Sequence, residues 1–350
     1  KFIDMEMFQF HPTGMLYPKK AEGMLVTEAV RGEGGILTNV KGERFMKKYD
    51  PKRLELSARD IITRAIYMEV KNGNGTKRGG VFLDISHKPK NYILKRLPKM
   101  YNQFKNYANI DISKQKMEVA PTAHYSMGGI FVDHTKGKTT IPNLFSIGEV
   151  TGGVHGANRL GGNSLAELMV FGKLTGKYIA NKVKKKKFIE LNKKIIKNEI
   201  ENLMKKLNNN GRDPIEIKKE IQKMMWKYAG VVRKERDMKR ALREIEKFKN
   251  IKLKTGKSLR LNEELIASLD IQNMIPTCEM IIKSALFRKE SRGAHYRSDY
   301  PKTLEKWNKN IICIPTNMGI KINTKNVSKI PREIEKFLNQ KNKVEVHLLE

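Results

Sequence analysis

Arginine and histidine side chains stand in this 350-residue chain beside glycines and prolines, in segments that could bind an anion. The clearest is GEVTGGVHGANRLGGNSLAELMVFGKLTGKYIA at 148–180, a glycine-dense loop that carries Arg159. Residues 141–147 before it read as a strand, because they are rich in branched and aromatic side chains. A glycine-rich loop that leads into a helix suits an anion or the polar edge of a cofactor, although a purely structural turn explains the glycines about equally well.

The helix after this loop is predicted to begin at Ser164, with Glu167 three residues later as a capping box. We expect one face of it to pack on a sheet. That face carries Leu165, Leu168, Gly172 and Gly176.

Two more segments place charged or titratable side chains near the start of the chain. Residues 1–10 read as a strand that ends at His11, which Pro12 follows. A histidine there can contact a substrate, although a hydrogen-bonded turn histidine is the commoner case. Glu28 and Arg31 lie three residues apart beside glycines, a spacing usually found in surface ion pairs of small energetic value.

Arg59 lies in the first turn of a helix predicted over 57–70, with Ser57 as its N-cap. A cation is disfavoured at that end by the helix dipole. Arg59 is therefore either an ordinary surface arginine offset by Asp60 or a residue that faces a site. The apolar positions expected to point inward are Ala58, Ile61, Ile62, Ala65, Ile66 and Val70.

Six segments together resemble a known family. They are QFHPTG at 9–14, TEAVRGEGG at 27–35, SARDIITRAI at 57–66, PTAHYSMGG at 121–129, GEVTGGVHGANRLGGNSL at 148–165 and ESRGAHYRSDYP at 290–301. In this order they resemble the catalytic flavoprotein subunits of succinate dehydrogenases and fumarate reductases. The most similar branch is the soluble thiol:fumarate reductase of methanogens, and L-aspartate oxidase is the near relative.

This resemblance implies an FAD-dependent oxidoreductase that interconverts fumarate and succinate, as a fumarate reductase that transfers hydride from reduced flavin. Arg59 would donate the proton, and Glu28 with Arg31 would reprotonate it, because a guanidinium rarely gives up its proton unaided. The substrate would be bound by His11, Thr27, His124, Arg159 and Gly162. The FAD would be contacted by Glu149, Asn163, Ser164 and Leu165, and no metal site is expected.

Two alternatives remain open from the sequence. L-aspartate oxidases usually have Ala-Ser where this chain has Gly161-Gly162, and often a cysteine where it has Met127, so both positions favour the fumarate/succinate side. The second alternative is a non-catalytic flavoprotein-like binding subunit, against which the intact set of arginines and histidines argues.

The resemblance also implies an α+β multidomain fold. A Rossmann-like FAD-binding domain would comprise 1–14 and 125–182, an inserted α+β capping domain 15–124, a helical bundle 183–300 and a C-terminal segment 301–350. The family's GxGxxG fingerprint is absent, so the chain reads as the C-terminal portion of a longer flavoprotein. We then expect exposed apolar faces on the strands at 5–10 and 130–132, and weak flavin binding by these 350 residues alone.

Helical periodicity in the second half predicts the bundle, with Pro276 as a kink or restart within 261–288. The stripes expected to be buried are Phe188, Leu191, Ile195, Leu203 and Leu207, then Ile217, Ile221, Met224, Met225 and Tyr228, then Met238, Leu242 and Ile245.

A formal net charge of +33 could suggest nucleic acid. However, 27 Lys and Arg against 10 Asp and Glu fall between 181 and 260, at helical spacing and without an aromatic stacking surface, so a solvated lysine-rich face is the better interpretation. Cys278 and Cys313 lack metal-ligand spacing and suit small buried residues in a reducing compartment. With no apolar run of membrane-spanning length, we expect a cytoplasmic protein, or a subunit peripheral to a membrane, whose partner is an iron–sulfur subunit docked near 290–301.

Overall fold

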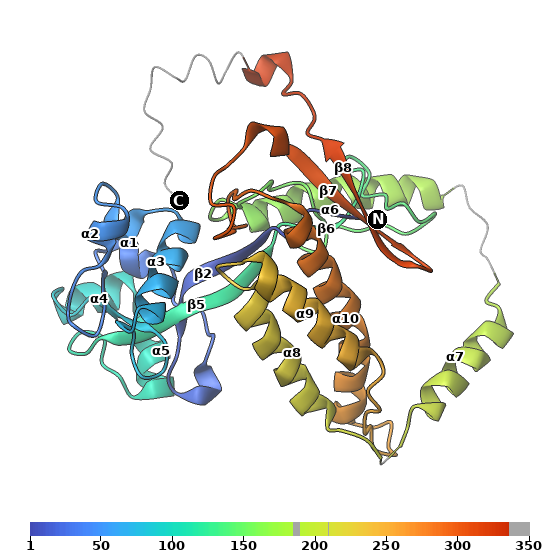
Figure 1. Cartoon of the computed structure of the whole chain (residues 1–350), viewed down its shortest axis with the longest axis horizontal. Helices are drawn as coiled ribbons and strands as arrows, with labels where there is room; N and C mark the ends of the chain where they lie inside the picture. Colours follow the sequence, from blue (N-terminus) through green and yellow to red (C-terminus); the bar gives the residue numbers. More distant parts are fainter. Residues whose placement is uncertain (185–189, 209, 336–350) are drawn as a thin grey trace. The chain divides into compact units, whose positions relative to one another are not determined.

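The computed structural model describes residues 1–184, 190–208 and 210–335. The chain forms two compact units, each of which mixes strands and helices, and the predicted α+β multidomain class is confirmed (Figure 1). Unit 1 contains Lys1–Met7, Met127–Ala157 and Gly162–Asn326; unit 2 contains Phe8–Ser126, Asn158–Gly161 and the residues from Val327.

Unit 2 is built on an antiparallel sheet of four strands in the order β2-β5-β4-β3. The strands are β2 (Phe8–Met15), β3 (Ile36–Thr38), β4 (Val81–Asp84) and β5 (Met117–Ser126). The helices are α1 (Ala29–Gly32), α2 (Met46–Tyr49), α3 (Arg59–Lys71), α4 (Lys90–Arg96) and α5 (Pro98–Ala108), with short 3₁₀ turns at Lys19–Ala21 and Leu54–Leu56. Its core joins α3 to the sheet through residues such as Ile62, Ile66 and Leu83.

Helix α3 confirms the predicted inward face but not the predicted cap. Ile62, Ala65 and Ile66 are fully buried. Ser57 is not the N-cap, because its hydroxyl donates to Asp50 Oδ2 at 2.7 Å and the helix begins only after Ala58.

The single strand predicted over 1–10 is wrong. The structure has β1 (Phe2–Ile3) in unit 1 and β2 in unit 2, because Asp4 adopts a left-handed conformation with φ of 50° and the Met7 amide donates back to the Asp4 carbonyl. This turn redirects the chain from one sheet to another. Met5, Met7 and Val132 are buried, and Phe8, Phe10 and Ile130 are partly buried, so the exposed apolar faces expected at 5–10 and 130–132 are not observed.

The ladder between β2 and β5 contains two bulges. Gln9 pairs with Tyr125 while Phe10 pairs with Ala123, which leaves His124 as the extra residue. A second shift lies between His11 and Gly14. Bulges break the alternation of side chains along a strand and can redirect a functional group.

Unit 1 combines a second antiparallel sheet with three long packed helices. The sheet has the order β6-β1-β7-β8, with β6 (Gly129–Ile130), β7 (Lys309–Thr316) and β8 (Gly319–Asn326). Helices α8 (Pro214–Ala229), α9 (Glu235–Lys249) and α10 (Glu263–Phe287) lie side by side in Figure 1. A 3₁₀ turn at Glu305–Trp307 precedes β7.

The bundle predicted from periodicity is confirmed for these three helices. Their shared core contains Ile217, Ile221, Met224, Tyr228, Met238 and Ile245, with Met225 and Leu242 partly buried against it. Helix α10 continues through Pro276, so the predicted restart is wrong. Cys278 and Cys313 are buried free thiols, as predicted.

The preceding helix α7 (Lys193–Lys205) does not join this core, contrary to the prediction. Ile195 and Ile200 on it are exposed, as is Leu191 before it. Leu203 and Leu207 are only partly buried, and Phe188 lies outside the described residues. An amphipathic pattern indicates a helix here but does not specify what its apolar face contacts.

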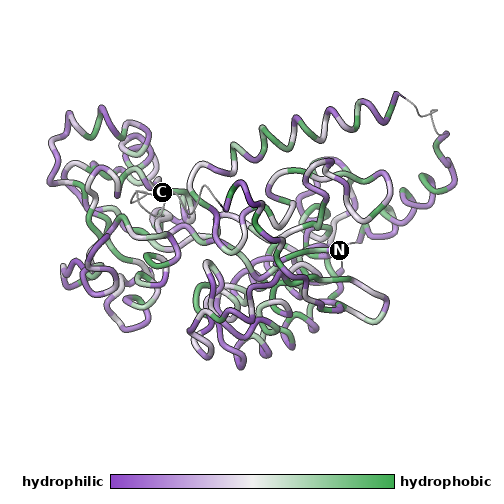
Figure 2. The backbone as a smooth tube through the Cα atoms, turned by 90° about the horizontal axis from the view of Figure 1, so that it is seen from above, coloured by the Kyte–Doolittle hydropathy of each residue, from purple (hydrophilic) through white to green (hydrophobic). Residues whose placement is uncertain are grey.

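Helix α6 (Asn163–Val183) also differs from expectation. Figure 2 shows apolar positions recurring along its length, and Leu165 and Leu168 are exposed rather than packed on a sheet. The strand predicted at 141–147 is wrong as well. Pro142 and Asn143 form a turn there, with Asn143 at a φ of 63°, and only Phe145 makes a β-bridge, to Lys138.

Candidate functional site

Arg59 stands at the first position of α3, in unit 2, and is held by a carboxylate. Glu28 Oε2 accepts from Arg59 Nε at 2.9 Å and from Nη2 at 2.6 Å. The Arg59 side chain is only 11% exposed, so the pair is not a solvated surface ion pair. The structure therefore removes the interpretation of Arg59 as an ordinary surface arginine.

Arg31 extends this pair into a row of three charged groups. Its Nη2 lies 3.8 Å from Glu28 Oε1, and its side chain is 1% exposed. The Arg31 Nη1 donates to the carbonyl of Glu55 at 2.6 Å, which anchors the guanidinium. Arg31, Glu28 and Arg59 thus form a continuous charged path with the carboxylate in the middle.

Arg159, in the short segment Asn158–Gly161 of unit 2, is the second buried arginine of the cluster. Its guanidinium carbon lies 4.4 Å from the centre of the Tyr125 ring, and its Nη2 donates to His124 Nε2 at 2.9 Å. Adjacent residues of a regular strand point to opposite faces, and the bulge at His124 allows both to contact one guanidinium.

Both histidines are neutral near pH 7. Burial, assisted by Arg31 and Arg59, lowers the pKa of His11 to about 3, and burial with Arg59 and Arg159 lowers the pKa of His124 to about 4. A guanidinium can only donate, so His124 Nε2 accepts from Arg159 and its proton lies on Nδ1. The two rings are 5.2 Å apart between centres, and His11 Nδ1 lies 3.0 Å from the Thr13 carbonyl.

The structure thus brings five predicted residues into one connected cluster in unit 2, with Arg31 at its edge. Thr27 directly precedes Glu28 and is partly exposed; its hydroxyl accepts from the Ala29 amide at 3.4 Å. The connected residues are Arg59, Glu28, His11, His124 and Arg159.

Three further residues of this cluster were missed in the sequence. Gln9 is 1% exposed and accepts from both Arg59 and Arg159, and Asn158 and Tyr125 complete the surroundings of Arg159. Gln9 lies two residues before His11 in a predicted strand, so same-face alternation was a usable signal. Nothing in the spacing pointed to Asn158 or Tyr125, whose contacts depend on tertiary structure.

The residues predicted to contact FAD lie in unit 1, around the start of α6. Gly162 is the N-cap residue with φ of 79°, and no side chain caps the first turn. Asn163 and Leu165 are exposed, Ser164 is partly buried, and Glu149 is exposed on the preceding turn. An uncapped helix N-terminus leaves amide donors that fit an anionic or polar cofactor edge.

The predicted capping box is wrong. The Glu167 carboxylate lies 3.1 Å from His155 Nε2, and both side chains are largely buried. Glu167 therefore ties the glycine-rich loop to α6 instead of capping the helix. The N-cap residue of α6 therefore makes no side-chain hydrogen bond to the first turn.

The segment at 290–301 is mostly interior to unit 1. Arg297 is fully buried and pairs with Asp299 at 2.7 Å, and Arg288 pairs with Glu6 at 2.7 Å and with Glu290 at 3.0 Å. Ser298, Asp299 and Pro301 are exposed, and Arg292 and Tyr300 are partly buried. These contacts give the segment a structural role, and its use by a partner stays a prediction.

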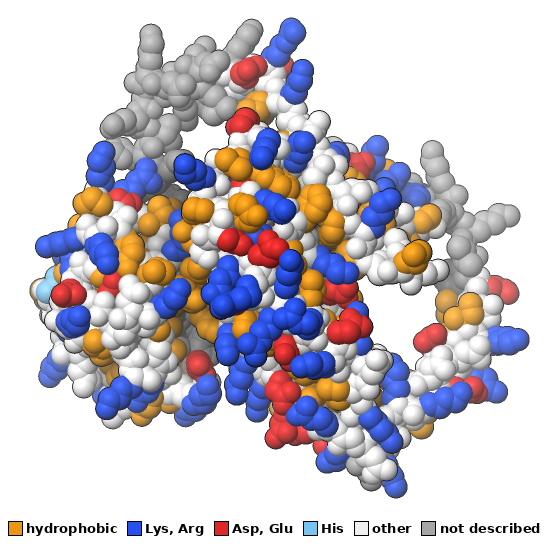
Figure 3. Space-filling view, in the orientation of Figure 1, with side chains coloured by type: hydrophobic (Ala, Val, Ile, Leu, Met, Phe, Trp, Pro, Cys, Tyr) orange, Lys and Arg blue, Asp and Glu red, His pale blue; other side chains and the backbone are white. Residues whose placement is uncertain are grey.

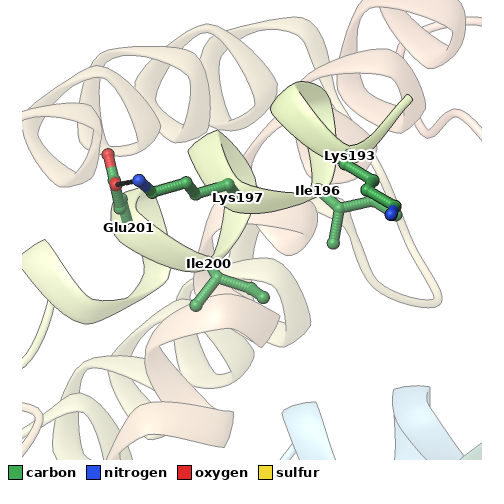
Figure 4. A pocket seen from close by; sticks show the side chains of 5 residues that line it. All are labelled: Lys193, Ile196, Lys197, Ile200 and Glu201. Carbon is green, nitrogen blue, oxygen red and sulfur yellow. Dashed lines mark ion pairs between the residues drawn. The ribbon is translucent and has the colours of Figure 1, made fainter. Parts of the chain in front are cut away.

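A hollow elsewhere on the described surface carries none of the predicted site residues. Figure 4 shows a hollow on α7 lined by Lys193, Ile196, Lys197, Ile200 and Glu201, with Lys197 and Glu201 4.0 Å apart. One helix supplies this whole lining, so the hollow cannot enclose a ligand. On the face shown in Figure 3, basic and acidic side chains are mixed, as is typical of a solvated surface.

Among the residues that the structure describes, no group of three or more histidine, cysteine or acidic side chains could hold a metal ion. Within the same residues, no helix is long and apolar enough to cross a membrane.

Comparison with known proteins identifies the family. Residues 1–165 match the FAD binding domain model, and residues 218–340 match the model of the fumarate reductase flavoprotein C-terminus. A curated relative, which belongs to the fumarate reductase (CoM/CoB) of Methanothermobacter marburgensis, is 45% identical over 316 residues, which are 89% of this chain and 56% of that protein. The chain belongs to the succinate dehydrogenase/fumarate reductase flavoprotein family.

Other members of this flavoprotein family are similar to the chain in sequence and in fold. The solved FrdA chain of E. coli quinol fumarate reductase has a TM-score of 0.83 at 32% identity, over 94% of this chain and 60% of that one. L-aspartate oxidase of Yersinia pestis is 35% identical over 310 residues, 87% of this chain and 55% of that protein. The chain therefore spans little more than half the length of the relatives that it matches.

The cofactor prediction is confirmed at the level of the flavoprotein family. The FAD binding domain match extends to Leu165 and so includes Glu149, Asn163 and Ser164. The individual contacts of these four residues with FAD remain predictions.

Proposed function

We propose that the protein containing this chain is an FAD-dependent oxidoreductase that interconverts fumarate and succinate and acts mainly as a fumarate reductase. The observation that carries this proposal is the connected cluster in unit 2, in which Arg59 and Arg159 flank neutral His11 and His124. Such a cluster provides both carboxylate recognition and a protonated group.

Charge supports a dicarboxylate substrate. The cluster contains three cationic side chains, Arg31, Arg59 and Arg159, and one carboxylate, that of Glu28. The neighbouring Asp60 is paired with Arg64 at 2.9 Å, and both histidines are neutral, so they do not change this balance. The excess positive charge matches a dianion. Arg159 and His124 would bind one carboxylate, and His11 with Thr27 the other, through charge-assisted and neutral hydrogen bonds.

Arg59 would deliver the proton to the alkene carbon next to the one that receives hydride. Loss of that proton from a guanidinium is unfavourable unless it is replaced immediately. Glu28, bound to Arg59 through Oε2 and 3.8 Å from Arg31 through Oε1, can return a proton to Arg59. The path would therefore run from Arg31 through Glu28 to Arg59.

The cofactor would be held at the start of α6 by Glu149, Asn163, Ser164 and Leu165, and the adjoining Gly162 would contact the substrate. In its reduced form FAD supplies the hydride. The uncapped amides of the first turn of α6 would stabilise negative charge on its polar edge.

The test is steady-state turnover of the full-length protein with FAD and a reduced viologen as electron donor. We expect reoxidation of the donor on addition of fumarate, and no hydrogen peroxide on addition of L-aspartate in air. Aspartate oxidation without fumarate reduction would replace this proposal with the L-aspartate oxidase alternative, to which similar relatives also belong. A protein that binds FAD but turns over neither compound would be the non-catalytic binding subunit.

We further propose an iron–sulfur protein as the electron-transfer partner, on the basis of the family resemblance. Purification of the full-length protein from its native source should recover a cysteine-rich iron–sulfur polypeptide in constant ratio. Recovery of the flavoprotein alone, still active with its natural electron donor, would contradict this.

A further inference from the structure

Gln9 has every hydrogen-bonding group of its side chain engaged within unit 2. Its Oε1 accepts from Arg59 Nη1 and from Arg159 Nη2, each at 3.2 Å. Its Nε2 donates to Asn158 Oδ1 at 2.7 Å and to the Arg159 carbonyl at 2.8 Å. A carboxamide offers two acceptor positions and two donors, so none remains unused.

The oxygen and the nitrogen of this carboxamide make different contacts. The carboxamide oxygen accepts from one nitrogen of each guanidinium. It therefore holds Arg59 and Arg159 close together, although the two cations repel each other. The nitrogen ties the segment Asn158–Gly161 to β2, and Asn158 in turn donates to Asp60 Oδ1 in the first turn of α3 at 3.4 Å. One residue thus links both arginines to the same strand.

We propose that Gln9 is a positioning residue that sets the separation of Arg59, the proton donor, from Arg159, the carboxylate-binding arginine. This inference rests on the proposed function. Leucine or methionine would supply no acceptor between the cations. Glutamate would keep the acceptor, but it would lose both donors and add a charge that neutralises the dicarboxylate site. Only a neutral carboxamide of this length meets both requirements here.

The test compares Gln9→Met, which has a similar volume and lacks all four bonds, with Gln9→Glu in the full-length, FAD-loaded protein. A matched control is Thr63→Val, which removes one buried bond between α3 and β2, Thr63 Oγ1 to the Phe10 carbonyl at 3.3 Å, and leaves the hydrogen bonds of Gln9 to both arginines in place. Succinate is the binding probe, followed through the flavin spectrum, and fumarate is the substrate.

We expect Gln9→Met to lower kcat for fumarate about 100-fold, since displacing a reacting group by about 1 Å has an effect of that order. The solvent deuterium isotope effect on kcat should rise, because misaligned proton delivery becomes rate-limiting. Succinate binding should weaken about tenfold in Gln9→Met and more in Gln9→Glu, whose charge opposes the ligand. Thr63→Val should match the wild type in all three measurements.

The inference is overturned if kcat and the succinate Kd of Gln9→Met stay within twofold of wild type, or if Thr63→Val reproduces the losses. A wild type that binds succinate but does not reduce fumarate would end the proposed function alone, and the succinate Kd values would then decide the role of Gln9. A wild type with neither property overturns both.

Discussion

Arg59 owes its orientation to Glu28 rather than to its helix. A cation in the first turn opposes the helix dipole, and two charge-assisted hydrogen bonds of 2.9 and 2.6 Å to the Oε2 atom of Glu28 compensate for this. In the proposed mechanism, the same contacts would align the guanidinium for proton transfer. Lysine would keep the charge but could not reproduce that planar arrangement.

Arg59→Lys should therefore retain FAD and succinate binding while kcat for fumarate falls about 10³-fold, the order contributed by a positioned general acid. Binding titration and steady-state kinetics on the same preparation separate the two effects. Lys95→Arg, a change at an exposed position of α4, is the control and should be silent. Turnover close to wild type in Arg59→Lys would remove Arg59 from the role of proton donor.

His11 is one of the buried histidines whose lowered pKa makes stability depend on pH. Its pKa is about 3 in the folded protein and about 6.5 when unfolded, so between these values the unfolded chain binds more protons. The contribution that neutral, buried His11 makes to stability is fully present above about pH 6.5 and is lost as the pH falls toward 3.

His11→Asn should consequently lose less stability than wild type between about pH 6.5 and pH 4, measured as the change in urea midpoint with pH. The exposed His87→Asn serves as the control and should follow the wild-type curve. Parallel curves for His11→Asn and wild type would show that His11 does not contribute.

At the scale of elements, the β2–β5 ladder and the three-helix core have different tasks. The ladder places Gln9, His11 and His124 through its two bulges, whereas α8, α9 and α10 bury a continuous apolar stripe. The helices therefore tolerate exposed substitutions but not cavities.

Ile221→Ala in α8 should lower the free energy of unfolding by about 2–5 kcal/mol, because Ile221 is fully buried and the cavity collapses only in part. Lys219→Ala on the exposed face of the same helix should change it by less than about 0.5 kcal/mol. Urea denaturation of both variants measures the difference, and equal effects would contradict the packing of α8 described above.

At the scale of the whole molecule, 70 Lys and Arg against 37 Asp and Glu produce strong self-repulsion. Exposed charges are screened over about 10 Å at 0.1 M salt, and screening relieves repulsion more than it weakens the scattered surface ion pairs. The lysine-rich surface is thus a source of instability at low ionic strength.

Raising sodium chloride from about 0.02 to 0.5 M should therefore increase the midpoint of thermal unfolding. An uncharged solute at equal osmolality is the control, and it should raise the midpoint of thermal unfolding less than sodium chloride does. A midpoint that falls with salt would mean that surface ion pairs outweigh the net repulsion.

Sequence motifs and periodicity were enough to predict the family, the α+β class, the three packed helices and most of the charged residues of the cluster. These depend on local signals: ordered motifs of a few residues each, and apolar periods that a helix or strand must satisfy wherever it packs. Arg59, His11, His124 and Arg159 could be named because each stands inside such a motif.

Only the tertiary structure decided how those residues connect. Gln9 meets Arg159 across 150 positions of chain, and Ser57 and Glu167 bond to Asp50 and His155 instead of capping their helices. The turn at Asp4 and the bulge at His124 likewise follow from pairing with distant strands. Hydrogen bonds between remote segments outweigh local propensity, because a buried polar group without a partner destabilises the fold more than an uncapped helix does.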